Sequence, residues 1–161
     1  MTENDETGRL ELIWVKRASR APMDAAAAAS LVPGRGILGN ANQGGQRQVT
    51  VIEREAWDAM MSELGVALPT STRRANLVVS GIRLEGSRGR ILRVGSCRLR
   101  VNGETRPCER MEAACPGLQA AMDPAWRGGI YAEVLDGGEI AIGARVSWAP
   151  VSEAPEFMKP A

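Results

Sequence analysis

The sequence contains no histidine among its 161 residues, and it has only three cysteines and two lysines. Without an imidazole, Ser-His-Asp and Cys-His catalysis and histidine-ligated zinc are excluded. Three cysteines cannot all pair within one chain, and their spacing contains no CxxC motif. We therefore expect neither a disulfide framework nor a structural zinc site, which leaves thiol, carboxylate and arginine chemistry open.

Long apolar runs are also missing. No stretch of 18 apolar residues occurs, and the N-terminal sequence MTENDETGRLE is acidic rather than basic and then apolar. These features predict no membrane span, no secretory signal and a cytoplasmic protein. A chain of this length with 44% hydrophobic residues predicts one domain with one core. We place that domain at residues 10–149, between a disordered N-terminus (1–9) and a mobile C-terminal tail (150–161).

Positive charge is present almost entirely as arginine, and it is concentrated in one segment. Residues 73–110 carry a net charge of +7, because ten arginines there face only three glutamates, while the whole chain carries +1. A GC-rich coding sequence would raise the arginine content but would not cluster it. Because a guanidinium binds phosphate or carboxylate through two parallel hydrogen bonds, the segment indicates defined anion contacts. It has no aromatic residue for base stacking, so nucleic-acid binding is not favoured.

Short β-forming runs separated by glycine dominate the rest of the chain. The expected strands are residues 10–17, 48–53, 76–84, 90–94, 97–101, 130–135 and 144–148. This spacing, without alternating strands and helices, predicts an α+β fold that is mainly β. We expect a barrel or strongly curved sheet of short, mostly antiparallel strands with helical insertions.

Two segments predict helices, and a third is ambiguous. Residues 53–64 place their apolar side chains on one helical face, and Gly65 follows as a stop signal. Residues 109–122 predict a second helix that Pro116 interrupts. The five alanines at 25–29 fit either a helical turn or a small-residue spacer.

Three segments combine glycine, arginine and polar side chains in a way that suits ligand binding. The first is the loop 39–48, whose amides and backbone N–H groups offer many donors and acceptors. The second contains Arg73 and Arg74 at the start of a strand, a pair suited to phosphate. In the third, Cys108 lies between Arg106 and Arg110, and such cations stabilise a thiolate. Each segment also has a structural interpretation: a surface loop, a solvated strand edge and a buried cysteine.

Taken in order, these segments resemble the MOSC domain family, named for the C-terminal part of molybdenum cofactor sulfurases. The resemblance covers residues 10–148 and is carried by Pro22-Met23 and by five longer stretches. These are PGRGILGNANQGGQRQVTVIE, RRANLVVSGI, GRILRVGSCRLRV, RPCERM and RGGIYAEVLDGGEIAIGARV. It implies a β-barrel protein that binds the molybdenum cofactor, a pterin dithiolene with a phosphate group.

The resemblance also assigns roles to individual residues. It implies that Cys108 is either a ligand to molybdenum or the carrier of a persulfide sulfur, and Cys108 is the predicted catalytic residue. It implies a pterin-phosphate site at the strand entry and further cofactor contacts in the glycine-rich loop. The predicted cofactor-binding residues are Gly39, Asn40, Gln46, Arg47, Gln48, Arg73, Arg74, Asn76 and Arg106.

The sequence departs from the family pattern in two ways. Family members commonly have Gly-Asp followed by His or Tyr in the loop, whereas this chain has Gly39-Asn40-Ala41. The pyridoxal-phosphate domain of the full sulfurases is also missing, so we expect no pyridoxal phosphate. Cys115 matches no family cysteine, and two interpretations stay open: core packing, or resolution of a persulfide or disulfide on Cys108.

Three functions follow as hypotheses. In the first, the protein is a molybdenum-dependent oxidoreductase that reduces N-hydroxylated substrates and takes electrons from a donor protein. In the second, it is a sulfur carrier that receives a persulfide on Cys108 from one protein and delivers it to a metal centre. In the third, it binds the cofactor without turnover.

Overall fold

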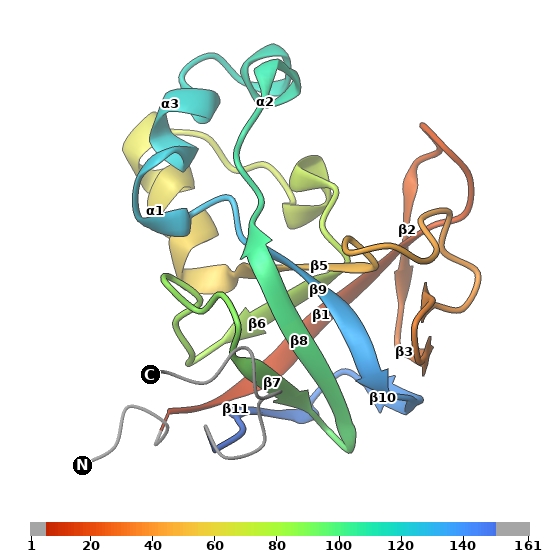
Figure 1. Ribbon diagram of the computed structural model, residues 1–161. Coiled ribbons are helices and arrows are strands. Elements are labelled where there is room, and N and C mark those ends of the chain that lie inside the picture. The colour runs from red at the N-terminus through yellow and green to blue at the C-terminus, as the bar shows by residue number, and fades with distance from the viewer. Residues whose placement is uncertain (1–5, 151–161) are drawn as a thin grey trace.

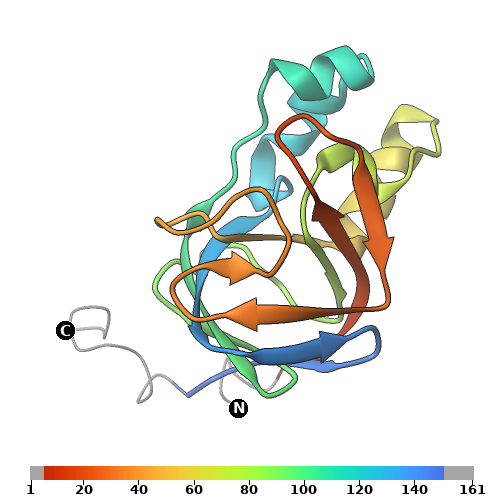
Figure 2. The same cartoon turned by 90° about the vertical axis from the view of Figure 1, so that its right-hand side faces the viewer.

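The computed structural model describes residues 6–150 and shows a closed barrel of seven strands (Figures 1 and 2). Around the barrel the order is β1, β6, β5, β9, β8, β7 and β11, and β11 pairs back with β1. Their bounds are β1 Thr7–Lys16, β5 Val49–Glu53, β6 Leu77–Ser80, β7 Ile91–Val94, β8 Cys97–Glu104, β9 Ile130–Asp136 and β11 Arg145–Trp148. All these pairs are antiparallel except β5–β6. The predicted fold class is confirmed.

The barrel closes through the first residues of β1. Thr7, Gly8 and Arg9 pair with residues 145–147 of β11, so the strand begins earlier than the sequence predicts. Residues 7–9 of the predicted disordered N-terminus therefore belong to the barrel. Residues 1–5 of that segment, and residues 151–161 of the predicted tail, lie outside the described residues.

Alternating side chains fill the barrel, as β8 illustrates. Cys97, Leu99 and Val101 are fully buried, as the alternation predicts. On the outer face, Arg98 forms an ion pair with Asp136 of β9. The interior is built mainly from Val, Leu and Ile side chains, and Trp148 also belongs to it. The core therefore fills the barrel and places ligand chemistry at its ends and outer surface.

The alanine segment is extended rather than helical. It is divided between β2 (Met23–Ala26), which pairs with β1, and β3 (Ala28–Val32), which forms a small sheet with β4 (Gly36–Ile37) and β10 (Gly138–Ala141). Alanine has little β preference of its own, so the pairing with β1 and β10 decides the conformation. β10 lies between the expected strands 130–135 and 144–148, in a stretch where the sequence predicts no strand.

The helices lie together at one end of the barrel (Figure 1). They are α1 (Arg54–Leu64), α2 (Glu109–Ala114) and α3 (Leu118–Met122), with the short 3-10 helices η1 (Thr70–Arg73) and η2 (Pro124–Trp126). α1 ends at Gly65 with φ of 65°, and α2 and α3 are separated around Pro116, as the sequence predicts. A second apolar cluster packs the three helices; it consists of Trp57, Met60, Met61, Met111, Cys115, Leu118 and Met122.

Candidate functional site

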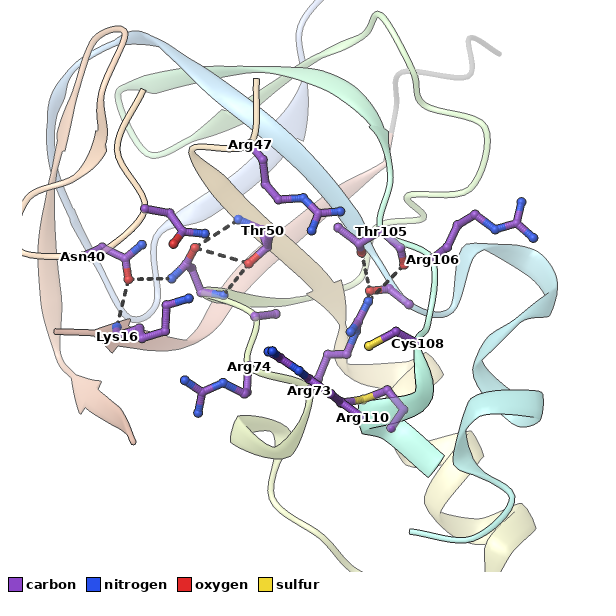
Figure 3. A pocket seen from close by; sticks show the side chains of 15 residues that line it. Lys16, Asn40, Arg47, Thr50, Arg73, Arg74, Thr105, Arg106, Cys108 and Arg110 are labelled. Atoms are coloured by element: carbon purple, nitrogen blue, oxygen red, sulfur yellow. Dashed lines mark hydrogen bonds between the residues drawn. The ribbon is translucent and has the colours of Figure 1, made fainter. Parts of the chain in front are cut away.

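A basic pocket lies where the barrel meets α2 and η1 (Figure 3). Its volume is about 250 Å³, and residues from β1, β5, the glycine-rich loop, η1 and the segment after β8 line it. Six of the lining side chains are basic, and none is Asp or Glu: the six are Lys16, Arg47, Arg73, Arg74, Arg106 and Arg110. Such a set attracts anions and disfavours cations.

Cys108 supplies the thiol in this pocket. The chain leaves β8 at Glu104, and Cys108 occupies the position immediately before α2. Its side chain is exposed, whereas Cys97 and Cys115 are buried. In Figure 3 the Cys108 sulfur lies beside the Arg73 side chain. The interpretation of Cys108 as a buried structural cysteine is therefore wrong.

Arg73 is fixed in place by two backbone carbonyls. Its Nε donates to the oxygen of Gly128 (3.0 Å) and its Nη2 donates to the oxygen of Thr105 (3.0 Å). Thr105 Oγ1 donates to the same Gly128 oxygen. Burial lowers the pKa of Arg73, and the nearby Cys108 opposes that shift. A guanidinium held in this way keeps positive charge next to the thiol, so Arg73 is not a solvated strand-edge residue.

Three further cations gather on the other side of the pocket. Arg74 has a left-handed backbone (φ 64°), and its Nη2 donates to the oxygen of Ala21 (2.6 Å). Burial lowers the pKa of the Lys16 amine, and the positive charges of Arg74 and Arg110 lower it further. Mutual repulsion among these cations would be relieved by a bound anion.

Two buried asparagines hold the loop that forms one wall. Asn40 Oδ1 accepts hydrogen bonds from the backbone N–H of Lys16 (2.8 Å) and from Nδ2 of Asn76 (3.2 Å). Asn76 Nδ2 also donates to the oxygen of Trp14 (3.1 Å), and its Oδ1 accepts the N–H of Thr50 (3.1 Å). Asn76 thus joins β1 to β5, through its Nδ2 and its Oδ1 respectively. Among residues 6–150, no hydrogen bond uses Nδ2 of Asn40.

Arg47 and Arg106 line the pocket but have partners elsewhere. The Arg47 guanidinium lies over the Tyr131 ring, 5.0 Å from its centroid. Arg106 points away from Cys108 in Figure 3, and its Nη2 lies 3.6 Å from Oδ1 of Asp123. Of the two, Arg47 also lies near enough to Arg73 for its charge to lower the pKa of Arg73 further.

The structure brings six of the nine predicted cofactor-binding residues to the pocket with Cys108 and leaves three outside its lining. Gly39 and Gln46 are exposed residues of the same loop. Gln48 is buried and structural: its Nε2 donates to the oxygen of Gly45, and its Oε1 accepts the N–H of Val134. Within the loop, Asn40 and Arg47 reach the pocket.

The sequence reasoning missed several lining residues, of which Lys16 and Arg110 bear charge. Lys16 ends β1, far from the other site residues along the chain, and barrel closure brings it to the pocket. The one feature of the sequence that could have drawn attention to Lys16 is that it is one of two lysines among many arginines. Arg110 was noticed beside Cys108, and its position on the first turn of α2 directs it toward Arg74 and Lys16.

Comparison with known proteins agrees with this arrangement. The family model of the MOSC domain matches residues 38–147, which include the glycine-rich loop, Arg73 and Cys108. The chain belongs to the MOSC domain family. The MOSC match ends within β11, so it covers most of the closed barrel and all three helices. A search of curated proteins gave no match.

Solved structures share the MOSC fold of this chain at low sequence identity. YuaD from Bacillus subtilis superposes with a TM-score of 0.74 at 19% identity, covering 88% of this chain and 95% of YuaD. YiiM from Geobacillus stearothermophilus gives a TM-score of 0.74 at 16% identity, covering 91% of this chain and 77% of YiiM. YiiM from Escherichia coli gives a TM-score of 0.65 at 17% identity, covering 88% of this chain and 70% of YiiM.

Residues 6–150 contain neither a membrane-spanning helix nor a cluster of metal ligands. No helix in this range is long and apolar enough to cross a membrane. No group of three or more Cys, Asp or Glu side chains there is arranged to hold a metal ion.

Proposed function

We propose that this MOSC protein binds the molybdenum cofactor in the basic pocket, with Cys108 as a thiolate ligand to molybdenum, and reduces N-hydroxylated compounds. The observation that carries the proposal is the placement of one exposed thiol in a pocket with six basic and no acidic lining residues. We propose that the protein acts in the cytoplasm and takes its electrons from a donor protein.

The residues present fit such a cofactor. A phosphate group suits the side of the pocket with Lys16, Arg74 and Arg110, where cations lower the pKa of the lysine and have no acidic partner in the lining. A thiolate is a soft ligand suited to a metal that is already bound by sulfur. Nδ2 of Asn40, which no hydrogen bond among residues 6–150 uses, offers a donor to a heterocycle, and Arg47 supplies a further cation.

When bound, the cofactor supplies the metal through which electrons reach the substrate. The chain contributes position and charge. Arg73, held by the Gly128 and Thr105 oxygens, keeps a positive charge beside Cys108. Lys16 and Arg74 bind and orient the anionic end, and Asn76 keeps the surrounding segments in place. Fixed donors of this kind need little reorganisation when a ligand arrives.

The exposed thiol also favours a second candidate, a sulfur carrier. Cys108 in a cationic pocket is suited to hold a persulfide, which is an anion at neutral pH, for transfer between a donor protein and a metal centre. A cofactor-binding module without turnover uses the same residues. The three functions differ in what the purified protein carries and in whether it turns over substrate.

Metal and pterin analysis of protein from a cofactor-producing host tests the proposal. We expect near-stoichiometric molybdenum and pterin, and reduction of an N-hydroxylated compound when an electron donor is supplied. Cys108→Ser should abolish activity, whereas Cys97→Ser should affect mainly folding, because Cys97 is fully buried in the barrel. Metal-free protein with cyanolysable sulfur on Cys108 would contradict the proposal and support the sulfur carrier. Cofactor without turnover would support the binding module.

A further inference from the structure

The three thiols of the chain differ sharply in accessibility. Cys108 is exposed, while Cys97 is 0% and Cys115 6% exposed. Cys97 lies inside the barrel, and Cys115 packs in the apolar cluster between the helices. A soluble reagent that modifies thiols therefore meets one target in the folded protein.

The surroundings of Cys108 select among reagents by charge. Arg73 lies beside the sulfur, and Arg110 follows it by two residues on α2. Lys16, Arg74 and Arg47 complete the pocket, and the lining contains no carboxylate to offset them. Cationic surroundings attract anionic reactants, with rate effects of roughly 10 to 1000-fold at low salt.

From this geometry we infer that Cys108 is a site of thiol–disulfide exchange selective for anionic low-molecular-weight disulfides, of which glutathione disulfide is the chemical type. In the exchange, the Cys108 thiolate attacks one sulfur of the disulfide. A bond forms between the protein and that sulfur, the original S–S bond breaks, and the other half leaves as a thiolate with the electron pair. The protein thiol is oxidised, half of the disulfide is reduced, and no other oxidant is required.

The mixed disulfide should persist once it has formed. Release from within the chain would need a second accessible thiol, and both remaining cysteines are buried. Cys115 Sγ is directed toward the oxygen of Pro116, at 3.7 Å. An external thiol must therefore restore Cys108. If the proposed function holds, on which this consequence rests, the adduct removes the metal ligand and fills the pocket, so the site is regulated by the thiol–disulfide balance.

Exchange rates with disulfides of different charge test the inference on the cofactor-free full chain. The probes are dianionic 5,5′-dithiobis(2-nitrobenzoate), neutral 4,4′-dipyridyl disulfide and cationic cystamine. Each rate is divided by that of a small neutral thiol under the same conditions, which removes differences between leaving groups. We expect the normalised rate for the anionic probe to exceed that for the cationic probe by about tenfold or more at low salt, and to approach it at 1 M salt.

Charge variants show whether the pocket causes the preference. Arg110→Gln should reduce the anionic preference by about threefold or more, because Arg110 lines the pocket and is exposed. Arg145→Gln is the matched control: it removes the same charge from an exposed position of β11 outside the pocket, and should leave the preference unchanged. With glutathione disulfide, mass spectrometry should find one glutathionyl group, on Cys108, and none in Cys108→Ser.

Equal normalised rates for the three probes would overturn the inference, as would labelling of Cys97 or Cys115 in folded protein while Cys108 stays free. Cofactor binding is scored separately, by the molybdenum and pterin content of protein that has met no disulfide. A protein that binds cofactor but shows no charge selectivity refutes only the inference. A selective thiol in a protein that never binds cofactor refutes only the proposed function.

Discussion

The Nη2 atom of Arg73 lies 3.0 Å from the carbonyl oxygen of Thr105, three residues before Cys108. This hydrogen bond joins η1 to the segment that leaves β8, and the bond from Nε to Gly128 adds the segment that enters β9. One side chain therefore holds three parts of the chain around the thiol. The position of Cys108 depends on contacts between residues that are distant in sequence.

Replacing Arg73 by lysine should destabilise the protein by about 1–3 kcal/mol, because an ammonium group cannot reach both carbonyl oxygens in the fork geometry of the guanidinium. Urea unfolding measures the effect. Arg83→Lys, at an exposed position outside the pocket, is the control and should change the free energy of unfolding by less than about 0.5 kcal/mol. Equal effects of the two substitutions would show that the hydrogen bonds from Arg73 to the Gly128 and Thr105 oxygens do not stabilise the protein.

Gly128 has no room for a side chain. A Cβ there would lie 2.3 Å from the oxygen of Thr105 and 3.2 Å from Nη2 of Arg73. We expect Gly128→Ala to lower the free energy of unfolding by about 1–3 kcal/mol. It should also alter the reactivity of Cys108, because the backbone must shift where Arg73 binds the Gly128 and Thr105 oxygens. Gly44→Ala is the comparison, since a Cβ at Gly44 meets nothing within 4 Å and carries only the strain of a left-handed backbone. Cys108 labelling should be normal in Gly44→Ala.

Asn76→Ala should destabilise the protein by about 1–3 kcal/mol, because it leaves the partly buried N–H of Thr50 and oxygen of Trp14 without their side-chain partner. Asn42→Ala provides the contrast: Asn42 lines the same pocket but is exposed, and the change should stay within about 0.5 kcal/mol. Thermal or urea unfolding of the two variants measures the difference in stability. A neutral Asn76→Ala would show that these hydrogen bonds do not hold the loop.

Anion binding should weaken with rising pH earlier than an ordinary lysine would allow. Lys16 is charged only below its pKa, which burial and the charges of Arg74 and Arg110 lower, so its attraction for an anion is lost as pH rises through that lowered value. Titration calorimetry with inorganic phosphate between pH 7 and about 10 tests this, since the unperturbed lysine value is about 10.4. The Lys16→Arg variant should keep its affinity for phosphate between pH 7 and about 10, because arginine stays charged there. Identical pH profiles would show that Lys16 does not contribute.

Local patterns were sufficient to predict the elements whose signals are local. α1 follows from its apolar face and from Gly65, and the inside–outside alternation of β8 follows from its sequence. The alanines at 25–29 carry no such signal, because their backbone is extended by pairing with distant strands. β10 was missed for the same reason: Gly138 suits a turn, but it pairs with Leu31.

The candidate site divides in the same way. Arg73, Arg74 and Cys108 could be predicted because each stands in a distinctive short motif. Lys16 could not, since only closure of the barrel brings the end of β1 beside η1 and α2. Gln48 has the composition of a binding residue, yet its amide is used within the fold. Sequence shows which polar groups are present, and the fold decides which of them remain available to a ligand.

X-ray absorption at the molybdenum edge of the loaded protein tests the central claim most directly. If Cys108 is a metal ligand, the wild-type spectrum contains one sulfur scatterer that is missing in Cys108→Ser, while Cys115→Ser, at a buried position, retains it. A metal environment that is the same in wild type and Cys108→Ser would contradict the account.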